Sequence, residues 1–129
     1  MVIVDSSVWI QAFRRSSPQE RFEVDRLLAQ GEALIVGPVF AEVLQGARNS
    51  QEFDSLRDRL SALPYQEETI ETWVRVGSLS YQLRRRGVAL ALVDVLIAAL
   101  AIEGEHSLYT LDDHFQRVPG LKLHKIGVG

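Results

Sequence analysis

The chain has 129 residues, and its 14 Lys and Arg against 17 Asp and Glu give a net charge of −3. It contains no cysteine, which excludes thiol nucleophiles, zinc knuckles and disulfide frameworks. Hydrophobic residues make up 47% and charged residues 24%, which excludes a disordered chain, while the acidic excess by itself argues against a nucleic-acid partner, because phosphates dominate such affinity.

Length and hydropathy predict one domain over residues 1–129 and no membrane span. The N-terminus has neither the basic region nor the long apolar stretch of a signal peptide, so we expect a cytoplasmic protein. The longest apolar run covers residues 88–102 and is interrupted by Asp94, which makes it too short and too polar to cross a bilayer. We interpret this run as buried core with one carboxylate embedded in it.

The first half of the chain predicts a strand, a helix and a second strand, followed by two more helices. Ser17, Pro18 and Glu20 are typical of a helix start, and Gly31 is typical of a helix end. The predicted elements are strands at residues 2–4 and 33–36 with this helix between them, helices at 38–48 and 51–63, and a short extended piece near 64–65.

The second half predicts a long helix over residues 69–86, closed by Gly87, and another over 93–103. Strands are predicted at 108–110 and 122–126, with a short helix over 114–118 between them. The long helix carries a stripe that, with three other aromatic residues, we interpret as core: Ile70, Trp73, Val74, Gly77 and Tyr81, with Trp9, Phe13 and Phe22. The pattern predicts an α/β domain with helices on both faces of a short, mainly parallel sheet.

Acidic residues follow the predicted strands. Asp5 comes directly after the first strand, Asp112 follows the strand at 108–110, and Glu42 lies in the first turns of the helix after the second strand. Asp94 joins them if its helix starts at the same edge. Ligands bind outside the carboxyl ends of the strands in such sheets, so these four acids are candidates for one site.

Each acid also has an ordinary structural interpretation. Asp5 could form a turn with the amides that follow it, and Glu42 could be a solvated helix residue. Asp112 could cap its short helix, with Asp113 adding favourable charge, and Asp94 could cap the helix that it begins. We favour a common site, because the convergence of four acids on one edge is a rarer coincidence than any one of these roles.

Carboxylates gathered without a lysine stay ionised only if cations occupy the cluster. Mg²⁺ takes one or two carboxylates, keeps several waters and binds phosphate oxygens with the rest of its sphere. One ion can activate a water while a second, about 4 Å away, stabilises the leaving oxygen. We interpret the histidines, His106, His114 and His124, as surface or cap residues, because they lack the paired spacing of a zinc site.

Four segments resemble the motifs of PIN-domain ribonucleases, and especially the VapC toxins of bacterial toxin–antitoxin pairs. They agree in order and spacing over essentially the whole chain: VIVDSSVWI at 2–10, VFAEVLQG at 39–46, DVLIAA at 94–99 and LYTLDDHF at 108–115. The resemblance implies a three-layer α/β/α PIN-like fold and an acidic centre that binds Mg²⁺ or Mn²⁺ and cleaves RNA.

Matched position by position, Asp5, Glu42, Asp94 and Asp112 take the family's four acidic places. The resemblance implies that all four are catalytic and ligate metal, with Asp5 and Asp94 as the firmest ligands. Ser7 takes the place of the hydroxyl residue that orients the first aspartate. Supporting positions are Thr110 and Asp113, and the doubled aspartate leaves open whether 112 or 113 is the fourth acid.

The implied reaction is hydrolysis of an RNA phosphodiester by metal-activated water, which leaves a 5′-phosphate and a 3′-hydroxyl. A haloacid-dehalogenase-like phosphatase is a poor alternative, because it needs a second carboxylate where this chain has Ser7. A receiver domain also fits poorly, because its acids fall elsewhere in the sheet. The serious alternative is a catalytically silent PIN-like scaffold that only binds RNA or protein.

Positive charge gathers at Arg84, Arg85 and Arg86, at the end of the long helix. These arginines could be a solvated helix end or could contact RNA phosphates beside the acidic pocket. The resemblance further implies a VapB-type antitoxin partner, received in apolar grooves near the N-terminal helices, and a homodimer formed through another face.

Overall fold

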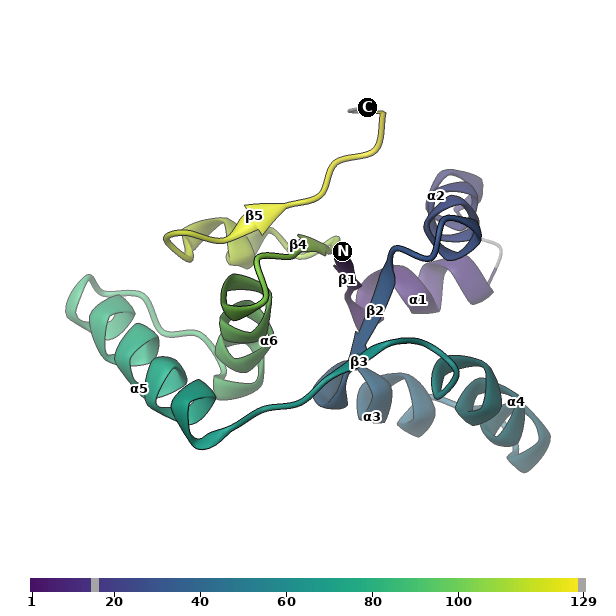
Figure 1. Cartoon of the computed structure of the whole chain (residues 1–129), viewed down its shortest axis with the longest axis horizontal. Helices are drawn as coiled ribbons and strands as arrows, with labels where there is room; N and C mark the ends of the chain where they lie inside the picture. Colours follow the sequence, from purple (N-terminus) through teal and green to yellow (C-terminus); the bar gives the residue numbers. More distant parts are fainter. Residues whose placement is uncertain (15–16, 128–129) are drawn as a thin grey trace.

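The computed structural model describes residues 1–14 and 17–127. Five strands in this part of the chain form one sheet, and every pair of neighbours is parallel. The order β3-β2-β1-β4-β5 places the first strand of the chain at the centre (Figure 1). The strands are β1 (Val2–Val4), β2 (Ala33–Val36), β3 (Tyr65–Gln66), β4 (Ser107–Tyr109) and β5 (Lys122–Leu123).

Helices cover both faces of the sheet. Figure 1 shows α1 and α2 on one side of the strands and α5 and α6 on the other, which confirms the predicted α/β/α layers. The helices in the described part of the chain are α1 (Ser6–Phe13), α2 (Pro18–Ala29), α3 (Gly37–Gln45), α4 (Ser50–Leu60), α5 (Ile70–Arg85), α6 (Leu92–Glu103) and a 3₁₀ turn, η1 (Asp113–Arg117).

The core is built around β1, because this strand has a neighbour on each side and helices above and below. Ile3 lies opposite Leu34 of β2 and Leu108 of β4. Ile3 and Val4 are completely buried, as expected for a central parallel strand with both faces covered. Whatever follows β1 is therefore held at the middle of the sheet's carboxyl edge.

Most predicted element boundaries are confirmed, including the two glycine stops. Gly31 and Gly87 have φ of 68° and 81°, in the left-handed region that ends helices and favours glycine. Three elements end three residues earlier than predicted: α3 stops at Gln45, α4 at Leu60 and β5 at Leu123. The chain after α3 turns early because Asn49 caps α4, accepting a hydrogen bond from the Glu52 amide at 2.8 Å.

The apolar stripe of α5 is not core, and that prediction was wrong. Ile70, Val74 and Tyr81 are 73%, 68% and 61% exposed, and Trp73 is also exposed. The helix instead packs on α6 through its opposite face, where the buried residues are Thr72, Val76 and Leu83. Phe22 is likewise exposed, Phe13 is half-buried, and only Trp9 of the predicted aromatic residues is fully buried.

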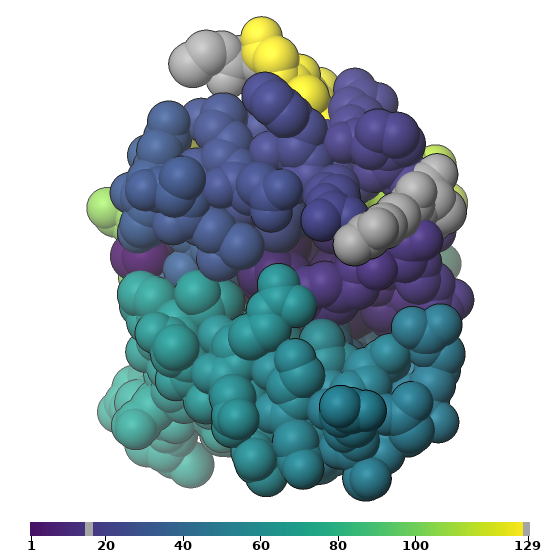
Figure 2. Space-filling model, turned by 90° about the vertical axis from the view of Figure 1, so that its right-hand side faces the viewer, coloured from purple at the N-terminus to yellow at the C-terminus, as the bar shows by residue number. Residues whose placement is uncertain are grey.

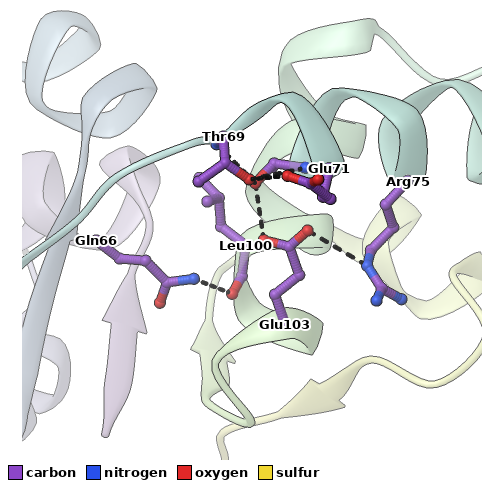
Figure 3. A network of polar contacts seen from close by, with 7 residues as sticks. Gln66, Thr69, Glu71, Arg75, Leu100 and Glu103 are labelled. Carbon is purple, nitrogen blue, oxygen red and sulfur yellow. Dashed lines mark hydrogen bonds and ion pairs between the residues drawn. The ribbon is translucent and has the colours of Figure 1, made fainter.

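A polar network joins α6 to α5 and to β3 (Figure 3). The buried Thr72 hydroxyl donates to Glu103 Oε2 at 2.8 Å, and Arg75 Nε lies 3.4 Å from Glu103 Oε1. Gln66 donates its side-chain amide to the Leu100 carbonyl at 2.9 Å. Because α6 is almost wholly apolar, these directed contacts set its position along the sheet, and with it the position of its first turn.

A second polar cluster fixes α2 against the C-terminal segment. Glu23, 3% exposed, accepts two hydrogen bonds from Arg26 at 2.7 and 2.8 Å, and His124 Nε2 lies 2.5 Å from Glu23 Oε2. His124 is therefore not the surface or cap residue that we predicted. Arg26, with help from His124, lowers the pKa of Glu23 to about 2 against the opposing effect of burial.

None of the helices within residues 1–14 and 17–127 is both long enough and apolar enough to span a membrane.

We predict that Glu23→Gln lowers the free energy of unfolding at pH 7 by about 2–3 kcal/mol, because charge-assisted hydrogen bonds at a buried site are lost. A depressed carboxyl pKa stabilises the fold above its unfolded value of 4.5 and ceases to do so as pH falls toward 2. Urea unfolding should therefore show the difference from wild type shrinking between pH 4.5 and 2. Asp25→Asn, on the exposed side of the same helix, is the control and should change little.

Candidate active site

The carboxyl ends of three neighbouring strands meet at one edge of the sheet. Asp5 follows β1, Thr110 follows β4, and α3 begins directly after β2 and carries Glu42. The Asp5 amide donates to the Tyr109 carbonyl at 2.8 Å, which extends the β1–β4 pairing to the first residue of the site. The parallel register thus brings together residues more than 100 positions apart.

Asp5 is 4% exposed and is held through one oxygen. The Ser7 hydroxyl donates to Asp5 Oδ2 at 3.0 Å, and the Thr110 hydroxyl donates to the same oxygen at 2.8 Å. Within the described residues, Oδ1 takes part in no hydrogen bond. The structure therefore brings the predicted Ser7 and Thr110 onto Asp5 and leaves its second oxygen available.

The same two hydroxyls accept bonds from the loop after β4. Leu111 N–H donates to Ser7 Oγ at 3.2 Å, and Asp112 N–H donates to Thr110 Oγ1 at 3.1 Å. Each hydroxyl donates its hydrogen to Asp5 and accepts a hydrogen bond from a backbone N–H, and these two bonds fix the rotamer of the side chain. The position of Asp112 is consequently tied to that of Asp5.

Glu42 faces the other three acids. Burial raises its pKa first of all, and the negative charges of Asp5, Asp94 and Asp112 raise it further. The Ser6 hydroxyl, 3.5 Å from Glu42 Oε2, opposes this rise weakly. All four predicted acids thus share one electrostatic environment. Ser6 was missed by the sequence analysis, although its place beside Asp5 and Ser7 was the available signal.

Asp94 lies in the first turn of α6 and does not cap it, because the cap position is Ala91. His114 Nε2 is 3.1 Å from Asp94 Oδ2, and its Nδ1 is 3.5 Å from Asp112 Oδ1. The His114 side chain is 36% exposed, so it does reach the surface, but its contacts with two acids were not predicted. Sequence spacing gave no sign of this contact, because the histidine and its partners come from different elements.

Asp112, and not Asp113, is the aspartate drawn into the cluster. Asp112 occupies the cap position of η1, but its side chain makes no capping bond and instead approaches His114. Asp113 is exposed and has no hydrogen bond or ion pair within the described chain. The charge that acts on Glu42 also comes from Asp112.

The arginines at the end of α5 are not brought to this cluster. Arg84, Arg85 and Arg86 are all exposed, and Arg85 lies over the Tyr81 ring at 5.7 Å from its centroid. None of the three pairs with an acid in the part of the chain that the structure describes.

The donor chemistry of the cluster fits a hydrated divalent cation. In residues 1–14 and 17–127, no three Asp, Glu or His side chains are arranged to hold a metal ion by themselves. Mg²⁺ does not require this, since one or two carboxylates, waters and substrate oxygens suffice. Neither Asp5 nor Glu42 forms an ion pair with a described residue, so their charges are offset by no Lys or Arg.

Comparisons with known proteins agree on a family. The sequence model described as PIN domain matches residues 2–121. The chain is 31% identical over 106 residues to the VapC ribonuclease Mb1587 of Mycobacterium bovis, covering 79% of each protein. The same identity and coverage relate it to the ribonuclease VapC11 of Mycobacterium tuberculosis.

Solved structures share the fold. The VapBC2 complex of Rickettsia felis bound to a promoter DNA fragment matches with a TM-score of 0.80 at 22% identity, over 96% of this chain and 98% of that chain. DNA-bound VapBC of Salmonella typhimurium gives 0.81 at 17% identity, over 95% and 96%. VapC20 of M. tuberculosis, described as a sarcin–ricin loop cleaving toxin, gives 0.70 at 15% identity, over 97% and 100%.

We predict that Glu42→Gln raises the melting temperature of the metal-free protein at pH 7 by a few degrees. A raised carboxyl pKa means that ionised Glu42 opposes folding above its unfolded value of 4.5, so removing the charge relieves repulsion. The gain should shrink as the pH of the thermal scan is lowered from 7 toward 4.5 and should be absent below 4.5. Asp113→Asn, which changes an exposed acid outside the cluster, should leave the melting temperature unchanged. An equal rise in the melting temperature of Asp113→Asn would contradict the assignment of Glu42, and not Asp113, to the acidic cluster.

Proposed function

The chain belongs to the PIN-domain family, among relatives named as VapC ribonucleases, and from this premise we propose that it is an endoribonuclease acting at Asp5, Glu42, Asp94 and Asp112. One observation carries the proposal: three acids raise the pKa of the fourth at the carboxyl edge of the sheet. Such a cluster costs stability, which is expected of a site kept for chemistry.

We propose Mg²⁺ or Mn²⁺ as the cofactor, held by Asp5 and Asp94 with help from Glu42 and Asp112. Bound there, the ion lowers the pKa of a water and offsets negative charge on the phosphate. Ser7 and Thr110 support this role, since both donate hydrogen bonds to Asp5 Oδ2 and neither uses Oδ1.

Glu42 is suited to accept a proton. Its pKa is raised toward the range where a general base works efficiently, and Ser6 contacts only Oε2, which leaves Oε1 to act. Attack of water oxygen on phosphorus, with the proton passing to Glu42, breaks the bond between phosphorus and the 3′ oxygen, which leaves with the bonding electron pair and takes a proton from solvent water. The products are a 5′-phosphate and a 3′-hydroxyl.

We propose further that the chain is the toxin of a VapBC-type toxin–antitoxin pair in the cytoplasm. A groove of about 480 Å³ is lined by residues of α1, α3 and α4. Figure 2 shows the α1 segment, in purple, next to the α4 segment, in blue-teal, on one face of the molecule. Ile10, Phe13, Val43 and Leu56 supply apolar contacts, and Arg14 and Arg59 contribute positive charge, while Arg48 is paired with Glu52 of the same groove at 2.9 Å. This combination suits an antitoxin segment with apolar and acidic side chains.

A homodimer formed through α5 is the remaining part of the proposal. The exposed stripe is centred on Gly77, where an added Cβ would meet no atom within 4 Å. Trp73 and Tyr81 each lie four residues from this glycine, so an antiparallel second copy would place Trp73 of each chain against Tyr81 of the other. An isologous interface requires this kind of self-complementarity.

Charge supports the antiparallel direction. The N-terminal end of α5 follows and includes acidic residues, and its C-terminal end is basic. Antiparallel pairing sets each acidic end against the partner's basic end, whereas parallel pairing would oppose like charges. The residues concerned are Glu67, Glu68 and Glu71 at one end and Arg84, Arg85 and Arg86 at the other.

We predict that Asp5→Asn lowers RNA cleavage at least 100-fold and removes growth inhibition. Asparagine keeps the shape of the buried side chain but lacks the negative charge that the proposed cation site needs. Wild-type cleavage of a short RNA should require Mg²⁺ or Mn²⁺, stop with chelator and leave 5′-phosphate ends, identified by mass spectrometry. Asp113→Asn is the matched control and should cleave normally.

Cyclic phosphate ends would contradict water attack at this cluster. RNA binding without cleavage in any metal would instead support the catalytically silent scaffold. Full activity of Asp5→Asn with an intact fold would remove Asp5 from the site.

We predict that Val74→Glu shifts a homodimer toward monomer by at least tenfold in dissociation constant, because a charge enters the apolar stripe. Light scattering after size-exclusion chromatography measures the mass. Phe22→Glu, on the other side of the sheet, is the control, since Phe22 is as exposed as Ile70 at 73%. A monomeric wild type, or dissociation by the control alone, would contradict an interface on α5.

A further inference from the structure

His114 holds a position that neither its spacing in the sequence nor the reaction as derived above accounts for. One ring touches two of the four acids: Nε2 is 3.1 Å from Asp94 Oδ2 and Nδ1 is 3.5 Å from Asp112 Oδ1. We propose that His114 is a positioning residue that fixes the Asp94 carboxylate for cation binding, an inference that rests on the proposed function.

The two carboxylates that we propose as the firmest metal ligands, Asp5 and Asp94, are each held through one oxygen. Asp5 Oδ2 accepts bonds from Ser7 and Thr110, and Asp94 Oδ2 accepts one from His114. In each case the described hydrogen bonds go to Oδ2, which leaves Oδ1 for a ligand. Carboxylates that ligate a metal are commonly oriented by such a partner on the other oxygen. His114 therefore does for Asp94 what the two hydroxyls do for Asp5.

The imidazole can orient a carboxylate because it is itself fixed. It stacks on Phe115, with ring centroids 4.9 Å apart and an angle of 28° between the planes. Phe115 is 1% exposed and belongs to the core, so the platform beneath the histidine does not move freely. The contact with Asp112 limits rotation further, and the ring keeps Nε2 directed at Asp94.

Asp94 needs such a partner more than Asp5 does. Asp94 projects from the first turn of an apolar helix and, within the described chain, has no hydrogen bond besides that from His114. Without the imidazole, the Asp94 side chain can populate several rotamers, and repulsion from the other acids favours those that point away from them. The expected loss is one of cation affinity, since the ligand must then be ordered when the ion binds.

The test compares His114→Ala with His114→Gln in the full chain, with Mn²⁺ alone as the probe and isothermal titration calorimetry as the readout. We expect His114→Ala to weaken Mn²⁺ binding about 10–100-fold. His114→Gln should stay within a few-fold of wild type, because its amide N–H reaches a place similar to that of Nε2. Gln116→Ala, exposed in the same 3₁₀ turn, should bind as wild type does.

Each result decides the matter. Unchanged or tighter Mn²⁺ binding by His114→Ala overturns the proposal, and so does an equal loss in His114→Gln, because the hydrogen bond would then not be the cause. If His114→Ala fails to fold, judged by circular dichroism, His114→Phe takes its place, because a phenyl ring can keep the stack on Phe115 but offers no N–H to Asp94. We expect the same weakening of Mn²⁺ binding in His114→Phe, and unchanged binding overturns the proposal. If the wild-type protein does not bind Mn²⁺, the proposed metal site is overturned together with the role of His114. If Mn²⁺ binding is lost in Asp5→Asn but kept in His114→Ala, the metal site stands and only the role of His114 is overturned.

Discussion

Repulsion among four carboxylates at one edge of the sheet is the constraint on which the rest of this structure depends. The charges of Asp5, Asp94 and Asp112 raise the pKa of Glu42, and burial raises it more. A fold that keeps such a group must offset its cost elsewhere. It does so with a buried central strand, and with directed contacts that hold α5 against α6 and α2 against the C-terminal segment.

The hydrogen bonds around the acids follow one plan. Hydroxyls from two elements fix Asp5, and an imidazole from a third fixes Asp94, each through Oδ2. Charge is thereby oriented and not neutralised, which suits a site that receives a cation and an anionic phosphate together. The acidic excess of the chain, a net charge of −3, comes from the proposed site: with its four acids set aside, 13 acids remain against 14 basic residues. An RNA partner is compatible with that balance.

Most helices and strands were predictable from the sequence, because a proline, a glycine or a run of β-branched residues restricts the backbone to few conformations. Proline at the start of α2, the glycine stops and the β-branched runs predicted a mainly parallel sheet and every element except α1, which the sequence analysis missed. The interpretation of α5 was wrong, because a helical apolar stripe indicates that a face will be covered but not by what. Here the opposite face of the helix meets α6, and the stripe meets solvent in the single chain.

The sequence by itself determined the fold class and predicted that four acids and Ser7 lie together, since strand ends in a parallel sheet share an edge whatever the details of packing. Only the tertiary structure showed that Asp112, and not Asp113, lies beside His114 and acts on Glu42, and only it brought His114 onto Asp94. Contacts of this kind depend on where a loop comes to rest against a helix, here one that carries its acid 20 residues before the histidine. No periodicity or spacing encodes that distance, because it is set by the packing of the elements between them.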